Sequence, residues 1–237
     1  MARNWMTAVL KKVIDESLAT KRFFFEVPEL ETFDYKAGQF ITFDLPIESK
    51  GTLRSYSIAS APDGSNTFEL CIVLNVKGAG TPYIFAAPVG TEFKFMGPIG
   101  KFQLIEPIET DICFIGTGTG VAPLRSMIYN IFDRQIPHKN IYLIFGNRYV
   151  PDILYRMELE KLSKKHPEFH FIPTLSRAGE EWDGPKGYVH PFYEKLFEDK
   201  REAHFYLCGW SDMVNEARKR LEMMGYDKGH VHFEKFD

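Results

Sequence analysis

The spacing of apolar residues changes near Pro107, and this change restricts the fold more than any other feature of the sequence. Before Pro107, short stretches rich in β-branched and aromatic residues are separated by glycine and proline, as in RFFFEVP (22–28) and QFITFDLP (39–46). In the second stretch, polar and apolar residues partly alternate, which is typical of a strand with one buried face. This pattern predicts a small antiparallel β-barrel over residues 1–107.

After Pro107, candidates for buried strands alternate with helical stretches. ICFI (112–115) is followed by apolar residues at steps of three and four, namely Val121, Leu124, Ile128 and Ile131. The alternation continues to the end of the chain and predicts a parallel sheet with helices on both faces over residues 108–237. The expected fold class is therefore a β domain followed by an α/β domain.

A second helical stretch, ILYRMELEKLSKKH (153–166), follows the next strand candidate. Its pattern places Leu154, Met157 and Leu162 on one side and most of its charges on the other. We therefore expect these three residues to form the buried face of a helix.

The composition excludes several classes of protein. A net charge of −3 argues against a protein that binds nucleic acid by neutralising phosphates. No run of 18 apolar residues is present, so we expect no membrane partner, and no apolar stretch typical of a signal peptide begins the chain. The three cysteines, Cys71, Cys113 and Cys208, are too widely spaced for a disulfide framework, a zinc site or an iron–sulfur cluster. We expect a reduced, cytoplasmic setting and no bound metal, since the pair His230 and His232 lacks a third ligand.

The glycine-rich segment CFIGTGTGVAPLRSM (113–127) lies at the first strand-to-helix junction of the second half. Ligands of open parallel sheets bind beyond the carboxyl ends of the strands, and a helix N-terminus there attracts anions. The candidate phosphate-binding residues are Gly116, Thr117, Gly118, Thr119, Gly120 and Pro123. The segment is neither a P-loop, because it lacks lysine, nor the dinucleotide motif GxGxxG, because Val121 replaces the last glycine. The alternative is a turn whose glycines only let a helix pack tightly on a strand.

The segment RSYSIAS (54–60) places a cation, an aromatic ring and hydroxyl groups on one short strand. Arg54 can hold a phosphate with two hydrogen bonds, Tyr56 can lie against a planar heterocycle, and Ser57 can hydrogen-bond a ring nitrogen. This combination suits a flavin nucleotide. The alternative is a surface strand with a solvated arginine.

Taken together, the sequence resembles the ferredoxin–NADP reductase superfamily over nearly its whole length. The matching segments occur in the order expected of that family: RSYSIAS (54–60), GAGTPYIFAAPVG (78–90), GPIGKF (97–102), GTGTGVAP (116–123), FGNRYVPDILYRMEL (145–159), YLCGW (206–210) and HFEKF (232–236). The resemblance implies an FAD-binding barrel over residues 1–107 and an NAD(P)-binding domain over residues 108–237. It also implies hydride transfer from nicotinamide C4 to flavin N5, followed by release of single electrons.

The resemblance assigns roles to individual residues. Arg54 would hold the flavin phosphate, Tyr56 would stack on the isoalloxazine, and Ser57 would hydrogen-bond near N5. The remaining flavin-binding residues would be Lys77, Gly80, Thr81 and Phe236. The turn at Gly116–Gly120 would bind the pyrophosphate of NAD(P)H, with Cys208 and Gly209 beside the nicotinamide. Ser57, Cys208 and Glu234 are the expected catalytic residues, although Glu234 is equally consistent with a solvated carboxylate on the final strand.

Two further expectations concern the cofactors. FAD is favoured over FMN, because FMN-binding relatives usually carry an additional arginine where this chain has only Lys77. NADPH is favoured over NADH, because Ser176, Arg177, Lys186 and Tyr188 match the residues that hold a 2′-phosphate in NADP-specific relatives. Relatives that use NADH often keep all of these except Lys186.

The expected electron acceptor is a separate protein, because the cysteines of an attached [2Fe–2S] domain are missing. Ferredoxin or flavodoxin is the first choice, and the ferredoxin of a mono- or dioxygenase system is the alternative. A regulatory module that binds nucleotide without turnover is the non-enzymatic alternative.

Overall fold

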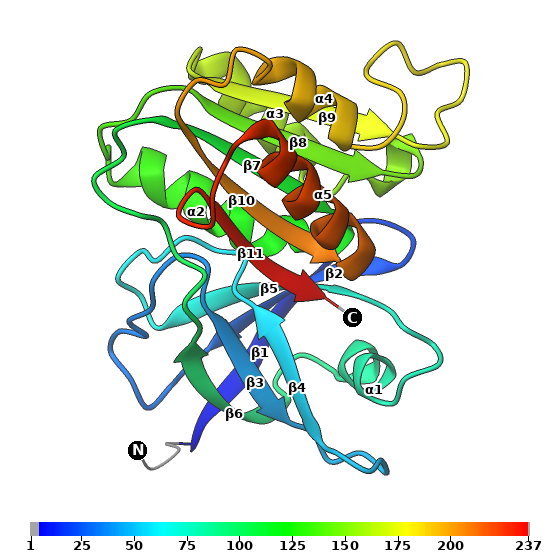
Figure 1. The fold of residues 1–237 in the computed structure, drawn as a ribbon. Helices are drawn as coiled ribbons and strands as arrows, with labels where there is room; N and C mark the ends of the chain where they lie inside the picture. The colour runs from blue at the N-terminus through cyan, green and yellow to red at the C-terminus, as the bar shows by residue number, and fades with distance from the viewer. Residues whose placement is uncertain (1–4, 237) are drawn as a thin grey trace. The chain divides into compact units, whose positions relative to one another are not determined.

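The structure is a computed structural model that describes residues 5–236 (Figure 1). Contacts divide the chain into two compact units. We call the first the barrel unit; it comprises the chain up to Leu104 together with Arg125–Phe132. We call the second the parallel-sheet unit; it comprises Ile105–Leu124 and the chain from Asp133 onward.

The barrel unit contains a six-stranded antiparallel sheet in the order β4-β3-β6-β1-β2-β5. Its elements are β1 (Trp5–Asp15), β2 (Thr20–Glu26), β3 (Phe40–Asp44), β4 (Leu53–Ser57), β5 (Thr67–Val73), α1 (Gly80–Ala86) and β6 (Glu92–Ile99). The two edge strands meet just beyond β4, where Ile58 forms a bridge with Leu70 and the Ala59 N–H donates to the Glu69 carbonyl at 2.8 Å. These contacts close the sheet into the barrel that the sequence predicts.

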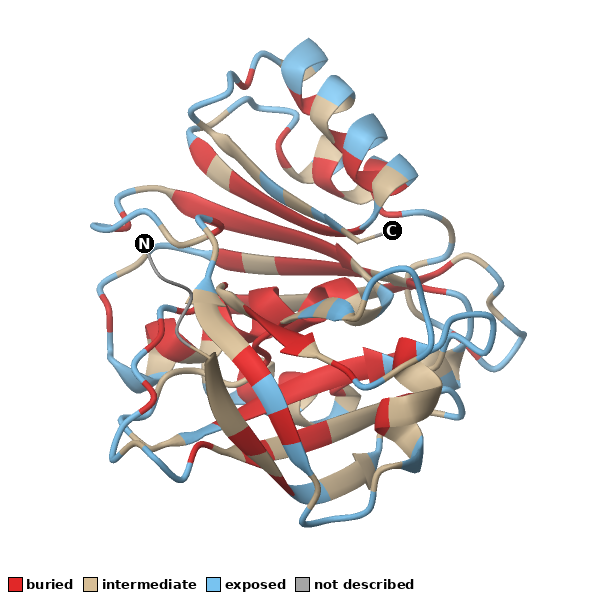
Figure 2. Ribbon diagram, turned by 90° about the horizontal axis from the view of Figure 1, so that it is seen from below, coloured by how far each residue is buried: buried red, intermediate tan, exposed pale blue. Residues whose placement is uncertain are grey.

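Aromatic side chains fill the barrel. Phe23 and Phe25 of β2 belong to the buried core while Phe24 between them is half-buried, as the two-residue period of a strand requires. Figure 2 shows buried and less buried residues interspersed along the strands. The Phe25 ring lies 5.3 Å from the rings of Phe43 and Phe68. Each fully buried phenylalanine contributes roughly 1.5–3 kcal/mol of hydrophobic stabilisation, so these rings contribute much of the stability of the barrel unit.

The parallel-sheet unit has five strands in the order β11-β10-β7-β8-β9. Its strands are β7 (Asp111–Thr117), β8 (Ile141–Asn147), β9 (Phe169–Leu175), β10 (Ala203–Trp210) and β11 (Val231–Phe236). Its helices are η1 (Gly118–Gly120), α2 (Val121–Asp133), η2 (Val150–Asp152), α3 (Arg156–Lys165), α4 (His190–Leu196) and α5 (Ser211–Met224). The chain fills the sheet outward from β7 in one direction and then restarts at β10 on the other side of β7. The topological switch point is therefore between β7 and β10, where ligands of such sheets bind.

Helices cover both faces of this sheet, as predicted. On one face, Cys113 and Ile115 of β7 share a buried cluster with Tyr193 of α4 and Val214 of α5. On the other face, Leu124 of α2 packs so closely on β7 that a Cβ on Gly116 would lie 2.9 Å from its Cδ1. The expected fold class, a β-barrel followed by an α/β domain, is confirmed.

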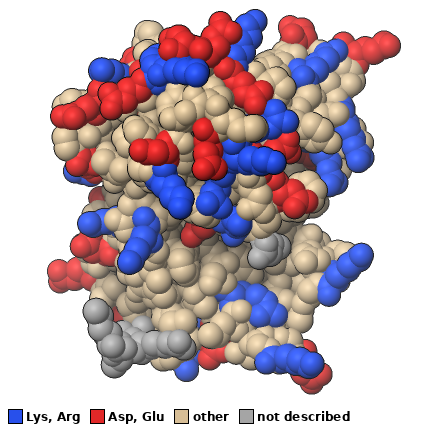
Figure 3. Space-filling view, in the orientation of Figure 1, with Lys and Arg blue, Asp and Glu red and all other residues tan. Residues whose placement is uncertain are grey.

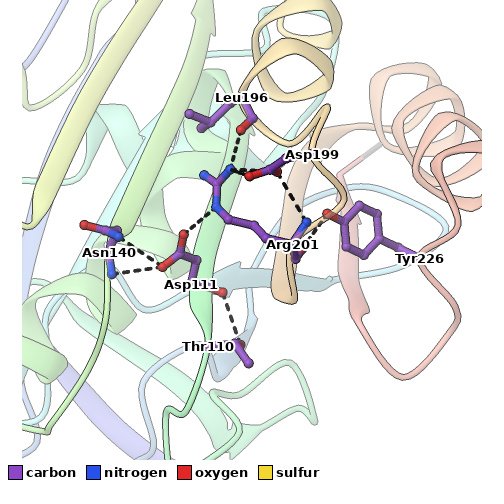
Figure 4. A network of polar contacts seen from close by, with 7 residues as sticks. All are labelled: Thr110, Asp111, Asn140, Leu196, Asp199, Arg201 and Tyr226. Atoms are coloured by element: carbon purple, nitrogen blue, oxygen red, sulfur yellow. Dashed lines mark hydrogen bonds and ion pairs between the residues drawn. The ribbon is translucent and has the colours of Figure 1, made fainter.

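A polar network joins the amino ends of the strands, at the edge opposite the switch point (Figure 4). The Arg201 Nε donates to Asp111 Oδ2 at 2.9 Å, and Asn140 donates to Asp111 Oδ1 from its main chain and its side chain, both at 3.2 Å. The Tyr226 hydroxyl donates to the Arg201 carbonyl at 2.8 Å. The network ties β7, β8 and β10 together at the ends opposite the switch point.

Residues 80–86 form α1, a short helix within the otherwise strand-like half of the chain. One local prediction is wrong. The predicted helix face at Leu154, Met157 and Leu162 does not form, because α3 begins at Arg156 and leaves Met157 85 % exposed. The buried face of α3 is instead formed by Leu159 and Leu162.

No helix among residues 5–236 is long and apolar enough to cross a membrane. Within the same residues no three His, Cys, Asp or Glu side chains are grouped to hold a metal ion. Figure 3 shows acidic and basic side chains interspersed over the face it presents.

Candidate functional site

Arg54 lies on β4 where the sequence predicts a phosphate-binding cation. Its guanidinium Nη1 donates to the carbonyls of Leu53 at 2.8 Å and Gly51 at 3.0 Å. The start of α1 packs against the same side chain, since a Cβ on Gly80 would lie 3.0 Å from Arg54 Cγ and Nε. The structure therefore brings together the two segments predicted to bind flavin, RSYSIAS and GAGTPYIFAAPVG.

Tyr56 and Ser57 follow Arg54 on the same strand; Tyr56 is half-buried, as Arg54 is, and Ser57 is buried. The Tyr56 ring centroid lies 5.9 Å from that of Phe43, so one side of the ring is supported by the barrel core. Burial raises the pKa of Tyr56 to about 12, so it presents a neutral phenol over the physiological range. Ser57 is buried beside Phe40 of β3, in register with it.

The loop before α1 is arranged around Asn75. The Thr81 hydroxyl accepts a hydrogen bond from the Asn75 main-chain N–H at 2.8 Å and lies 3.2 Å from the Asn75 carbonyl. The Lys77 N–H donates to Asn75 Oδ1 at 3.1 Å, and its side chain is exposed. Lys77 in this loop and Thr81 at the start of α1 therefore lie close together in the segment that packs on Arg54, and the Thr81 hydroxyl closes the loop.

The residues that fix the chain just after β4 were not predicted from the sequence. In the barrel unit, Arg125 of α2 donates to the Ala59 carbonyl at 2.7 Å, and the Ser126 hydroxyl donates to the Ser60 carbonyl at 2.6 Å. The buried Glu69 carboxylate lies 3.5 Å from Arg125 and is also held by Arg22. A buried arginine is tolerated here because a carboxylate and a carbonyl satisfy it. The only sequence signal was the pair Arg–Ser directly after GVAPL.

The nucleotide turn is built from the backbones of two strand ends. β7 ends at Thr117, and η1 leads directly into α2. A Cβ on Gly120 would overlap the Cys208 carbonyl, and Gly209, at φ +136°, has no room for one because of Thr117 Oγ1. The Trp210 N–H donates to that same Thr117 hydroxyl at 3.2 Å. The carboxyl ends of β7 and β10 thus meet at the switch point, with main-chain N–H groups and the α2 N-terminus available to an anion.

Cys208 is buried at the end of β10, in register with Glu234 of β11. Burial raises the pKa of the Cys208 thiol well above its usual value, and the charge of Glu234 adds to the effect. The side chain is therefore a neutral, polarisable thiol, which agrees with a role as a wall rather than a nucleophile. Phe236 lies two residues beyond Glu234, in register with Trp210.

The four residues expected to recognise a 2′-phosphate gather at the carboxyl end of β9. Ser176 and Arg177 follow that strand directly, and Lys186 forms a bridge with Leu175, its last residue. Tyr188 follows on an exposed stretch. Two further residues here were not predicted from the sequence. The Tyr149 hydroxyl lies 3.5 Å from Arg177 Nη1, and the carbonyl of Arg148 accepts a hydrogen bond from the Arg177 N–H at 3.0 Å.

Comparison with known proteins agrees with this arrangement. A family model for an oxidoreductase FAD-binding domain matches residues 7–104, and one for an oxidoreductase NAD-binding domain matches residues 114–219. A curated protein of Sorangium cellulosum, "Ferredoxin--NADP reductase B", is 35% identical over 90% of this chain and 90% of its own length. The chain therefore belongs to the ferredoxin–NADP reductase superfamily.

Some other similar proteins are longer than this chain. The "Glycine betaine monooxygenase reductase subunit" of Chromohalobacter salexigens is 29% identical over 95% of this chain, which spans 62% of that protein. The crystal structure of an Amycolatopsis cytochrome P450 reductase has a TM-score of 0.88 and 26% identity, covering 100% of this chain and 71% of its own. A ferredoxin NADP+ reductase from Neisseria gonorrhoeae shares the fold at a TM-score of 0.84 and 24% identity, with 99% of both chains covered.

The residues present fit the cofactors that this family implies. The barrel unit offers a guanidinium beside a glycine, a supported aromatic ring and a buried hydroxyl on one strand, as a phosphorylated flavin requires. The parallel-sheet unit offers a backbone-lined turn too close-packed for a Cβ, as a pyrophosphate requires. The chain is a flavin-dependent oxidoreductase that uses FAD and NAD(P)H, as the sequence predicted.

Proposed function

We propose that the protein transfers electrons from NADPH through FAD to a separate one-electron carrier, with ferredoxin or flavodoxin as the acceptor. The observation that carries the NADPH assignment is the gathering of Ser176, Arg177, Lys186 and Tyr188 at the end of β9. A 2′-phosphate brings about two negative charges, and cations and hydroxyls at this position satisfy them. The similarity to a ferredoxin–NADP reductase over almost the whole chain supports the acceptor.

The residues of the barrel unit orient the flavin and neutralise the charge of its phosphates. Bound FAD would supply the redox chemistry, namely uptake of a hydride from the reduced nicotinamide and release of its two electrons one at a time. Arg54 and the loop with Lys77 and Thr81 bind the flavin phosphates, while Tyr56 fixes the plane of the ring. Ser57, held at the end of β4, donates a hydrogen bond near the reacting flavin nitrogen.

The parallel-sheet unit orients the nucleotide. The turn from Gly116 to Gly120 and the α2 N-terminus bind its pyrophosphate, with Pro123 in the first turn of the helix. Cys208 and Gly209 form a small wall that lets the nicotinamide approach closely. Glu234 and Phe236 lie on β11 beside β10, and the roles toward the flavin that the resemblance implies for them are part of the same proposal.

The nucleotide preference is tested by kcat/KM for NADPH and NADH with a dye acceptor, in the wild type and in Arg177→Ala. The loss of a charge-assisted contact costs about 1.5–3 kcal/mol, so kcat/KM for NADPH should fall about 10- to 100-fold and that for NADH should change little. Met157→Ala, an exposed change on α3, is the control. An equal loss for both nucleotides, or a wild type that prefers NADH, would contradict the assignment.

A second candidate is the reductase component of a mono- or dioxygenase system. Similarity to reductase subunits of glycine betaine monooxygenase and to the anthranilate 1,2-dioxygenase electron transfer component favours it. Anaerobic mixing with NADPH and then with purified ferredoxin, flavodoxin or an oxygenase ferredoxin separates the two candidates by their rates. Failure of NADPH and NADH to bleach the bound flavin would instead favour the regulatory module.

A further inference from the structure

Trp210 occupies the start of a helix, a position that its side chain does not stabilise. It is the N-cap residue of α5, yet its side chain makes no capping hydrogen bond. Ser, Thr, Asp and Asn are preferred at N-caps because their oxygens accept from the free N–H groups of the first turn. Its indole is also 66 % exposed. A residue that breaks a local rule without a structural gain marks a candidate functional position.

The backbone of Trp210 is nevertheless fixed beside the nucleotide turn. Its N–H donates to Thr117 Oγ1 at 3.2 Å, and Gly209 before it is locked against the same threonine. Cys208 lies two residues earlier on β10. The indole is thus anchored at the switch point while its rings remain open to solvent.

The strand order says which part of the nucleotide reaches Trp210. The residues for the 2′-phosphate lie at the end of β9, the pyrophosphate turn follows β7, and Trp210 ends β10. From β9 to β10 is three strand spacings, or about 14 Å, along the carboxyl edge of the sheet. A dinucleotide laid along this edge with its adenosine at β9 and its pyrophosphate at β7 has its nicotinamide riboside at β10.

We propose that Trp210 is a positioning residue whose indole packs against the nicotinamide riboside of the bound nucleotide. The oxidised nicotinamide ring carries a positive charge, and tryptophan is the strongest aromatic partner for a cation. The inference rests on the proposed nucleotide site, but it does not depend on whether NADP+ or NAD+ is preferred.

The test uses calorimetric titration of the FAD-loaded protein with NADP+ and with 2′,5′-ADP, which lacks the nicotinamide. Trp210→Ser should weaken NADP+ binding about 2- to 30-fold, the range of a cation–π contact, and leave 2′,5′-ADP binding unchanged. Trp210→Phe, which keeps a ring, should retain most of the affinity. Met223→Ala, an exposed apolar change at the far end of α5, is the matched control. If the wild type prefers NAD+, the pair becomes NAD+ and ADP.

Thermal unfolding distinguishes the proposed role from a merely structural one. If Trp210 only stabilised the fold, its replacement by serine would lower the unfolding midpoint. Serine is a good N-cap, so Trp210→Ser should raise the unfolding midpoint by about 2–4 °C while it weakens NADP+ binding. Unchanged NADP+ affinity, an equal loss for NADP+ and 2′,5′-ADP, or a lower midpoint would each overturn the proposal. If the wild type binds neither ligand, the proposed nucleotide site itself is wrong.

Discussion

The two units offer different kinds of chemical groups to their cofactors. On β4 of the barrel unit, the candidate flavin contacts are side chains: a guanidinium, a phenol ring and a hydroxyl. At the switch point of the parallel-sheet unit, they are mostly main-chain groups, and the glycines there leave no room for a Cβ. β4 is an edge strand that pairs along its length with β3, and the groups that the sequence places on it for a ligand are side chains. A strand that runs into a helix leaves N–H groups unpaired, so it can offer the backbone itself.

The largest expected effect comes from adding a side chain in the turn from Gly116 to Gly120, which should impair the use of NADPH. In Gly120→Ala the new Cβ overlaps the Cys208 carbonyl, and because this obstacle is backbone it cannot move aside. We expect kcat/KM for NADPH to fall by more than about 100-fold, as a misplacement of about 1 Å can cost that much, while bound FAD stays at the wild-type level. Steady-state kinetics and the flavin absorbance measure the two effects.

Gly118→Ala is the matched control in the same turn. Gly118 has φ +53°, but no atom lies within 4 Å of the position of its Cβ. The left-handed conformation costs a residue other than glycine about 1–2 kcal/mol, so a loss of only about 5- to 30-fold is expected. Equal losses in the two variants would mean that close packing on β10 does not define the site.

Removing a side chain should break the barrel site next most severely. Arg54→Ala loses a charge-assisted contact worth about 1.5–3 kcal/mol, so FAD should bind about 10- to 100-fold more weakly. Equilibrium dialysis of the flavin gives the affinity. Arg134→Ala removes an exposed arginine that pairs with Glu106 and should leave FAD binding unchanged. Full FAD affinity in Arg54→Ala would mean that RSYSIAS has been misassigned.

Cys208 is a side chain in the site that is otherwise formed by main-chain groups, so its substitution tests how much a side chain contributes there. Its thiol pKa is raised by burial, so it stays protonated through pH 9. Cys208→Ala should therefore lower kcat by a few-fold, up to about 10-fold, with KM nearly unchanged, because only the packing against the nicotinamide is altered. The pH–rate profiles of wild type and variant between pH 6 and 9 should be parallel. A wild-type limb in that range that the variant lacks would reveal a thiolate.

The backbone-built site was the easier one to predict from sequence. Glycines at 116, 118 and 120 between an apolar run and a helical period encode strand, turn and helix within a few neighbouring residues. The switch point could be anticipated in the same way, because a parallel sheet follows from the alternation of strands and helices.

Features that depend on distant contacts were not predictable. Arg125 reads as an ordinary helix residue until the fold brings Ala59 and Glu69 to it. The burial of α3 was misjudged because Tyr155, with φ +56°, is left-handed and delays the helix start to Arg156. The residues of α1 include proline and aromatics, whose local preferences do not favour a helix. The roles assigned to Ser57, Glu234 and Phe236 stay predictions.

The smallest expected effect is a difference between the two units in how their stability depends on pH. All seven histidines follow residue 133, so they belong to the parallel-sheet unit. His232 on β11 has its pKa lowered to about 4, first by burial and then by the nearby His204 and His230. His204 Nδ1 lies 3.1 Å from His232 Nε2, Asp227 pairs with His230, and the Tyr206 ring covers His232.

The sign of the effect follows from the two states of His232. The unfolded chain takes up a proton near pH 6.5, whereas the folded protein resists protonation until about pH 4. The stability that His232 contributes is therefore complete above pH 6.5 and is lost as the pH falls toward 4. Differential scanning calorimetry at pH 7 and pH 5 should show the midpoint of the parallel-sheet unit falling by a few °C, on the order expected for one partly exposed group. His232→Phe, which keeps an aromatic ring against Tyr206, should reduce that fall, while the pH dependence of FAD release from the barrel unit stays the same. An unaltered fall in His232→Phe would assign the pH sensitivity to another group of the sheet.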